Sequence, residues 1–191
     1  MRKSSEPKMG PPAAMLALAK AATEEEAKAA AAYFAGFKYN SSWIKVTEAA
    51  MVPKTRVAGG MMTPIEGGGT EPIGQRVVEV AVNPEATELR DSGSGFIAYV
   101  PVGSIKAGEA LATTGGAGKT VRCSICHGTD LKGLGNVPPL AGRSPSYLVR
   151  QMWDIKSGNR NGAGAQLMKE AVGKLGVDDM VNLAAYAASR N

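Results

Sequence analysis

The sequence predicts a mainly α-helical chain: a helical domain at the C-terminus, preceded by a loop-rich segment with short β-strands and by an N-terminal helical half-domain. Three observations lead to this prediction. Helical patterns of apolar residues occupy residues 12–36 and again 103–191. Between them, Gly and Pro interrupt the chain repeatedly. Only short runs in that middle stretch have the composition of strands.

The first stretch, residues 12–36, is rich in alanine, a strong helix former. Thr23 and Glu26 have the spacing of a capping box, in which each side chain binds the backbone N–H of the other. We therefore expect a second helix to start at Thr23. Gly36 is expected to end it.

The middle stretch contains repeated turn signals, among them Gly59-Gly60 and Asn83-Pro84. Two runs between these signals are rich in β-branched and aromatic residues, Arg76–Val82 and Phe96–Val102, and both are predicted strands. The last stretch has helical patterns near 104–113, 145–157, 163–173 and 177–189. These boundaries divide the chain into residues 1–36, 37–103 and 104–191.

Composition limits the classes of function. The chain has 191 residues, of which 44% are hydrophobic but only 5% aromatic. Few large side chains are available to fill a core, so a flat apolar cofactor would help to stabilise so small a domain. The net charge is +5, but no basic run occurs, which argues against nucleic-acid binding. The basic residues are scattered, which is typical of an ordinary solvated surface. Their diffuse positive field would also steer the chain toward acidic partner surfaces.

No stretch of about 20 apolar residues occurs, so no membrane span is predicted. The residues after Met1 also lack the apolar run of a secretory signal.

One motif carries chemistry: Cys123-Ser124-Ile125-Cys126-His127. Cys-x-x-Cys-His is the attachment signature of c-type haem. Two cysteines three positions apart on a helical turn can both reach the vinyl groups at one edge of a porphyrin. The adjacent histidine then lies beneath the iron and donates a ring nitrogen.

Other interpretations of these residues are weaker. A thioredoxin-like dithiol should follow a β-strand, but an apolar strand does not precede Cys123. A structural zinc ion takes four ligands, and the chain has two cysteines and one histidine. The run Gly115–Thr120 resembles a phosphate-binding loop, but that pattern requires glycine where Thr113 stands.

The C-terminal 85 or so residues resemble the class I cytochromes c, most closely the bacterial periplasmic ones that occur as two-haem tandems. An ordered set of motifs carries the resemblance: Gly108, Cys123–Gly128, Gly133-x-Gly135, Pro138–Gly142, Tyr147-Leu148, Gln151, Arg160, Met168, Asp178–Met180 and Leu183–Tyr186.

The resemblance implies one haem c per chain and a role for each matching residue. Cys123 and Cys126 would hold the haem covalently, and His127 would be the proximal iron ligand. The carbonyl of Pro138 would accept a hydrogen bond from the His127 ring, which orients the ring and makes its free nitrogen more basic. Met168 would be the distal ligand.

Other methionines compete with Met168. Met180 lies on the apolar stripe of the last predicted helix and is expected in the core. Met152 lies in the predicted helix 145–157, beside the haem. Met168 precedes the last helix, where a class I fold returns the chain across the distal face. A second axial histidine is impossible within the chain, since His127 is its one histidine.

A His/Met-ligated iron has no open coordination position, so the resemblance implies electron transfer between redox partner proteins rather than enzymatic catalysis. The alternatives are a cytochrome subunit or domain of a larger redox enzyme and, with an open iron, a gas-binding haem protein. The family also implies a periplasmic location. We therefore expect an export signal that this chain does not display.

An internal repeat has an offset of 153 residues, the difference between positions 15 and 168. At this offset Met15 matches Met168, and Ala31-Ala32-Tyr33 matches Ala184-Ala185-Tyr186. Residues 1–36 would then correspond to the distal half of a second cytochrome domain, with Met9 or Met15 in the place of Met168. No Cys-x-x-Cys-His precedes them. Either the chain is truncated at this end, or the half-domain is a packing element without haem.

Overall fold

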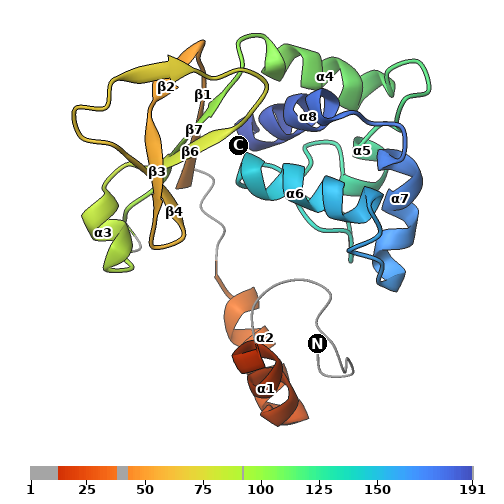
Figure 1. Ribbon diagram of the computed structural model, residues 1–191. Coiled ribbons are helices and arrows are strands. Elements are labelled where there is room, and N and C mark those ends of the chain that lie inside the picture. The colour runs from red at the N-terminus through yellow and green to blue at the C-terminus, as the bar shows by residue number, and fades with distance from the viewer. Residues whose placement is uncertain (1–12, 38–42, 92, 191) are drawn as a thin grey trace. The chain divides into compact units, whose positions relative to one another are not determined.

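The computed structural model describes residues 13–37, 43–91 and 93–190 (Figure 1). The chain forms two compact units, Met1–Asn40 and Ser41–Asn191, which are described separately. Met9, which with Met15 is a candidate for the place of Met168 in the repeat, lies outside the described residues.

The described part of the first unit contains two helices, α1 (Ala13–Ala21) and α2 (Glu24–Ala35). The predicted capping box is confirmed at the start of α2. Thr23 Oγ1 accepts a hydrogen bond from the Glu26 N–H at 3.1 Å, and the Glu26 carboxylate accepts one from the Thr23 N–H at 2.8 Å. Gly36 caps the end, as predicted. None of the α2 side chains is buried.

The second unit contains two sheets beside a group of helices (Figure 1). The larger sheet has five strands in the order β1-β7-β6-β4-β3, and the smaller pairs β2 with β5. The strands are β1 (Ile44–Glu48), β2 (Met51–Pro53), β3 (Thr55–Ala58), β4 (Met61–Pro64), β5 (Thr70–Pro72), β6 (Val78–Ala81) and β7 (Phe96–Val100). β1 runs parallel to β7 and β4 parallel to β6, whereas the other pairs are antiparallel.

The expectation of a mainly α-helical fold is wrong. A mixed five-stranded sheet and a second sheet occupy the stretch that we predicted to be loop-rich. Some of the Gly residues there form tight turns between strands, and Pro53, Pro64 and Pro72 are the last residues of β2, β4 and β5. Gly59 and Gly60, with φ of 58° and 81°, make the two-residue connection between β3 and β4. Positive φ at both central residues is what such a hairpin requires.

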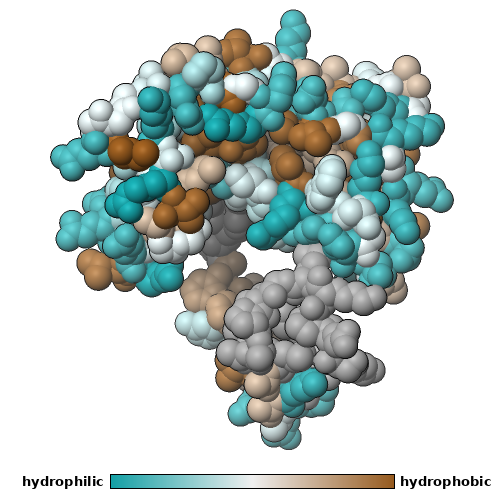
Figure 2. Space-filling view, in the orientation of Figure 1, coloured by the Kyte–Doolittle hydropathy of each residue, from teal (hydrophilic) through white to brown (hydrophobic). Residues whose placement is uncertain are grey.

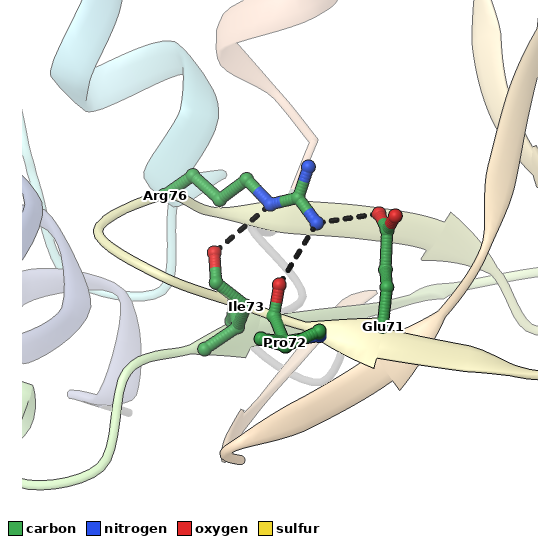
Figure 3. Close-up of polar contacts among 4 residues, drawn as sticks. All are labelled: Glu71, Pro72, Ile73 and Arg76. Carbon is green, nitrogen blue, oxygen red and sulfur yellow. Dashed lines mark hydrogen bonds and ion pairs between the residues drawn. The ribbon is translucent and has the colours of Figure 1, made fainter.

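The sheet has its own core. Val52 and Ile73 from the β2–β5 side pack on Val78 and Val80 of β6. The connection from β5 to β6 is held by Arg76, which donates hydrogen bonds from Nε to the Ile73 carbonyl at 2.9 Å and from a terminal nitrogen to the Pro72 carbonyl at 3.2 Å (Figure 3). The same guanidinium forms an ion pair with Glu71.

Among the described residues, seven helical elements complete the second unit. They are α3 (Pro84–Glu88), α4 (Ser104–Thr114), α5 (Ser124–His127), α6 (Pro145–Lys156), the 3₁₀ helix η2 (Ala163–Ala165), α7 (Gln166–Val172) and α8 (Val177–Ser189). The predicted strands at Arg76–Val82 and Phe96–Val102 and the four predicted C-terminal helices are confirmed, with small differences at their ends. Met180, Val181, Ala184 and Ala188 of α8 are buried, as the apolar stripe predicts. Within the described part of the chain, the helices are too short or too polar to cross a membrane.

The division at residues 36/37 and 103/104 stays a prediction. Strand β1 contacts α8, so the sheet and the C-terminal helices pack against each other within the second unit.

Candidate functional site

The motif predicted to attach haem forms a single helical turn, α5. Cys123 is its N-cap residue, and the Cys123 carbonyl accepts hydrogen bonds from the His127 N–H at 2.9 Å and the Cys126 N–H at 3.3 Å. One short turn therefore positions all three motif side chains. Both thiols are free; Cys126 is exposed and Cys123 is partly buried. Burial raises the pKa of the Cys123 thiol, which keeps it protonated at neutral pH.

The His127 ring is buried, with 5% of the residue exposed. Its Nδ1 lies 2.8 Å from the carbonyl oxygen of Pro138. Because a carbonyl oxygen only accepts hydrogen bonds, Nδ1 carries the proton in this arrangement and Nε2 carries the unshared electron pair. Among the described residues, Nε2 of His127 is the one buried side-chain nitrogen or oxygen without a hydrogen-bond partner.

A loop of hydrogen bonds holds the chain around the histidine. The Gly133 N–H donates to the His127 carbonyl at 2.8 Å, and the N–H groups of Leu140 and Ala141 donate to the Leu131 carbonyl at 2.8 and 3.0 Å. Further along, Arg143 Nε donates to the Pro139 carbonyl at 2.8 Å. Pro138, whose carbonyl faces the ring, therefore lies in a segment tied at several points.

Met168 lies on α7, half-buried. It packs against a cluster of buried apolar residues from α4, α6, α7 and α8, and Cys123 packs against the same cluster. Met152 on α6 and Cys123 both contact this cluster and a second one that includes Leu131 and Leu148. Met180 is 1% exposed within the first cluster, in keeping with its predicted place in the core.

Apolar side chains next to the motif residues are exposed. Ile125, between the two cysteines, is 58% exposed, and Leu167, beside Met168, is 84% exposed. On the face shown in Figure 2, hydrophobic side chains interrupt a mostly hydrophilic surface in several separate places.

These residues fit a covalently attached haem. The site offers two free thiols on one turn and a buried imidazole whose lone pair is unpartnered. A buried polar nitrogen without a partner is costly to a fold unless something binds it. A metal ion is a fitting partner, since a histidine ligand characteristically donates its other ring N–H to a carbonyl.

Two carboxylates that contact this part of the molecule were missed by sequence reasoning. Glu48 of β1 accepts a hydrogen bond from the Ile105 N–H at 2.9 Å, and Glu79 of β6 accepts one from Ser144 Oγ at 2.8 Å. Both contacts join residues more than fifty positions apart, so no local pattern in the sequence could have revealed them.

Comparison with known proteins identifies the family, although no family model matches the chain. Cytochrome c-554(548) of Halomonas halodenitrificans is 38% identical over 85 residues, which is 44% of this chain and 99% of that protein. Cytochrome c4 of Azotobacter vinelandii is 37% identical over 91 residues, 44% of this chain and 42% of that protein. The cytochrome subunit of sulfide dehydrogenase from Chlorobaculum tepidum is 32% identical over 72 residues, 38% of this chain and 64% of that protein.

The chain thus spans about two fifths of the length of the cytochrome c4 that it matches. It covers nearly the whole of the smaller cytochrome c-554(548). This match covers nearly all of the related protein, and the chain has the Cys-x-x-Cys-His turn with both thiols free. This chain therefore belongs to the class I c-type cytochromes.

Proposed function

We propose that this protein transfers electrons through one haem c, bound covalently by Cys123 and Cys126. The haem, when bound, supplies an iron that takes up and releases single electrons. His127 is the proximal ligand through Nε2, and Met168 is the distal ligand. With both axial positions held by the protein, the function is electron carriage rather than oxygen or substrate chemistry.

The state of His127 carries this proposal. Its Nδ1 is bound to the Pro138 carbonyl at 2.8 Å, while Nε2 is buried and has no partner. The carbonyl holds the ring in one tautomer and one orientation, and it increases the donor strength of Nε2. The His127 ring therefore presents Nε2 to a metal in a fixed orientation.

The other motif residues have complementary roles. The partly buried Cys123 packs against the apolar cluster that Met168 also contacts, so it anchors one edge of the haem at the core. The exposed Cys126 anchors the same edge near the surface. An exposed edge of this kind suits electron exchange with partners that dock briefly through small interfaces.

The partners are redox proteins, and the charge of the chain favours acidic docking surfaces. Residues 104–191 contain eleven Lys and Arg against six Asp and Glu, so the net positive charge of the chain lies in this stretch. We place the protein in the bacterial periplasm, where c-type haem is attached. The relative that is a sulfide dehydrogenase subunit supports a second candidate: a cytochrome subunit that serves a catalytic subunit directly.

The N-terminal helices are proposed to be a remnant of the distal half of a second cytochrome domain. α1 begins at Ala13 and α7 at Gln166, which is the offset of the sequence repeat. The N-cap residues of α2 and α8, Thr23 and Gly176, have the same offset. In each helix the acidic third residue, Glu26 or Asp179, accepts a hydrogen bond from the N-cap N–H at 2.8 Å. The side chain of Met15 lies outside the described residues.

The test is the optical spectrum of the protein, oxidised and reduced, after expression in a periplasm with haem-attachment machinery. We expect covalent haem and, in the oxidised state, the weak long-wavelength band of a sulfur–iron bond. Met168→Ala should abolish that band. Met152→Ala is the matched control, since Met152 contacts the same buried cluster, and it should retain the band.

Two results would contradict the proposal. Wild-type protein that is already high-spin and binds carbon monoxide readily would have an open iron and favour gas binding. Loss of the band in Met152→Ala, with retention in Met168→Ala, would transfer the distal role to α6. Copurification with a catalytic subunit would favour the enzyme-subunit alternative.

A further inference from the structure

The large sheet presents two carboxylates to the helical domain from the same face. In the strand register, Glu79 of β6 lies opposite Ala98 of β7, and Glu48 of β1 lies opposite Val100. Ala98 and Val100 are two positions apart, so they point to one face of the sheet, and their paired neighbours point with them. Both β7 residues are fully buried. This face is therefore the one packed against the helices.

Each carboxylate binds the N-terminus of a different helix. Glu48 accepts a hydrogen bond from the Ile105 N–H in the first turn of α4 at 2.9 Å. Glu79 accepts one from Ser144 Oγ at 2.8 Å and a longer one from the Ser146 N–H at 3.5 Å, at the start of α6. A negative charge at a helix N-terminus is favoured by the helix dipole and by its unpaired N–H groups. α4 has no side-chain cap from its own N-cap residue, Gly103.

The Glu79 contact is connected to the chain segment whose Pro138 carbonyl binds the His127 ring. Ser144 Oγ donates to Glu79 and accepts from the Tyr147 N–H at 3.1 Å, so it joins the sheet to the first turn of α6. Six positions before Ser144 lies Pro138, whose carbonyl holds the His127 ring. Between them, Arg143 Nε donates back to the Pro139 carbonyl at 2.8 Å. The segment 138–144 is thus held by Glu79 at one end and meets the imidazole at the other.

The charges of the two regions agree with this arrangement. Residues 41–103 contain seven Asp and Glu against five Lys and Arg, whereas residues 104–191 have a basic excess. The stretch that includes the sheet thus has a small acidic excess, and it contacts the basic stretch through Glu48 and Glu79.

We infer that Glu79 is a positioning residue for His127: through Ser144 it fixes segment 138–144, and so sets the strength of the hydrogen bond from His127 Nδ1 to the Pro138 carbonyl. This inference rests on the proposed role of His127 as an iron ligand. It gives the sheet a part in the redox chemistry, because hydrogen bonding to an axial histidine tunes the reduction potential.

The experiment compares Glu79→Ala, Glu79→Gln and Glu48→Ala with the wild type. Two quantities are measured on the purified protein: the solvent exchange rate of the His127 Nδ1–H by ¹⁵N NMR in the reduced state, and the reduction potential. Glu79→Ala should speed the exchange by at least about tenfold, the effect of losing a charge-assisted hydrogen bond that stabilises the segment. The potential should rise, because a weaker hydrogen bond makes Nε2 a poorer donor to the oxidised iron.

The other variants separate positioning from stability. Glu79→Gln keeps an oxygen that can accept from Ser144 Oγ, so it should restore most of the wild-type exchange rate and potential. Glu48→Ala removes a comparable contact on the same face and should lower stability without changing either quantity. The inference is overturned if Glu79→Ala has the wild-type exchange rate and potential, or if Glu48→Ala changes both as much.

Failure of the proposed function would look different. A wild-type protein without covalent haem after periplasmic expression would contradict haem attachment. The Nδ1–H exchange of that same chain would still report on the connection between Glu79 and His127. That connection runs through Ser144 and segment 138–144, and all of its hydrogen bonds are made by the polypeptide. Faster exchange in Glu79→Ala would then support the positioning role, and unchanged exchange would overturn it.

Discussion

The carbonyl oxygen of Asn182 on α8 lies so close to Gly108 on α4 that a Cβ atom added to the glycine would stand 1.9 Å from it. The Cβ of Tyr186 would be 2.9 Å from the same added atom. The two helices therefore cross in contact through their backbones, and the crossing has room for a hydrogen atom only. Since Ala112 of α4 and Leu183 of α8 belong to the cluster that Cys123 and Met168 contact, this crossing supports the site directly.

Replacing Gly108 by alanine should therefore separate α4 from α8. We expect Gly108→Ala to lower the free energy of unfolding by about 3 kcal/mol, the upper end of the usual cost of overpacking. Urea unfolding measures this change. Gly164→Ala is the control, because an added Cβ there meets nothing within 4 Å, and it should change stability by less than about 0.5 kcal/mol. Equal stability of the two variants would contradict the close crossing.

The ion pair of Asp179 with Lys119, at 2.8 Å, should make stability depend on acid pH. Burial alone would raise the pKa of Asp179, but hydrogen bonds from Lys119 and the Gly176 N–H, with the charges of Lys119 and Lys156, outweigh it and lower the pKa below 3.8. A carboxyl whose pKa is lowered by folding stabilises the fold at pH values above its unfolded pKa. That stabilisation is lost as the pH falls through the folded pKa.

We therefore expect Asp179→Asn to be less stable than the wild type near neutral pH, and the difference to shrink as the pH falls through the acid range. Urea unfolding at about pH 6 and about pH 3 measures it. Asp178→Asn, at the exposed neighbouring position, is the control and should follow the wild type. A difference between Asp179→Asn and the wild type that is constant with pH would show that the carboxylate charge does not matter.

Arg76 and Glu71 should contribute unequally to the free energy of unfolding, although they form one ion pair (Figure 3). Both side chains are partly exposed, so Glu71→Ala should cost at most about 1 kcal/mol. Arg76→Ala also removes the donors to the Ile73 and Pro72 carbonyls and should cost about 1–2 kcal/mol more. Thermal or urea unfolding of both single variants gives the comparison, and equal losses would mean that the carbonyl contacts add nothing.

The helices and the motif were predictable because their signals are local. The capping box of Thr23 and Glu26 involves residues three positions apart, and the turn that positions Cys123, Cys126 and His127 needs five consecutive residues. The sheet was not predictable in the same way. Ile44 pairs with Phe96 in a parallel ladder, and no pattern near Ile44 indicates its partner. Glycine turns such as Gly59-Gly60 looked like loop because the strands on either side of them are only four residues long.

The candidate site was likewise predictable only in part. The sequence supplied the motif residues, and the family resemblance supplied Pro138 and Met168. The structure adds that His127 Nε2 is buried without a partner, which depends on the packing of the whole domain. It also adds Glu79, whose contact with Ser144 depends on the register of a sheet that the sequence did not reveal.

The parallel ladder between β1 and β7 has a consequence for the order in which the molecule assembles. β1 is the first strand of the second unit and β7 is the last strand of its sheet. Closing that ladder joins residues separated by all the intervening strands, and such long-range contacts form slowly. When the chain is synthesised from its N-terminus, β1 stays without its β7 partner until residues up to Val100 have been made. α4 begins at Ser104, soon after β7 ends at Val100, and the cysteine turn α5 follows at Ser124. The sheet therefore completes its pairing only when the chain has already extended to the start of the helices that include the cysteine turn.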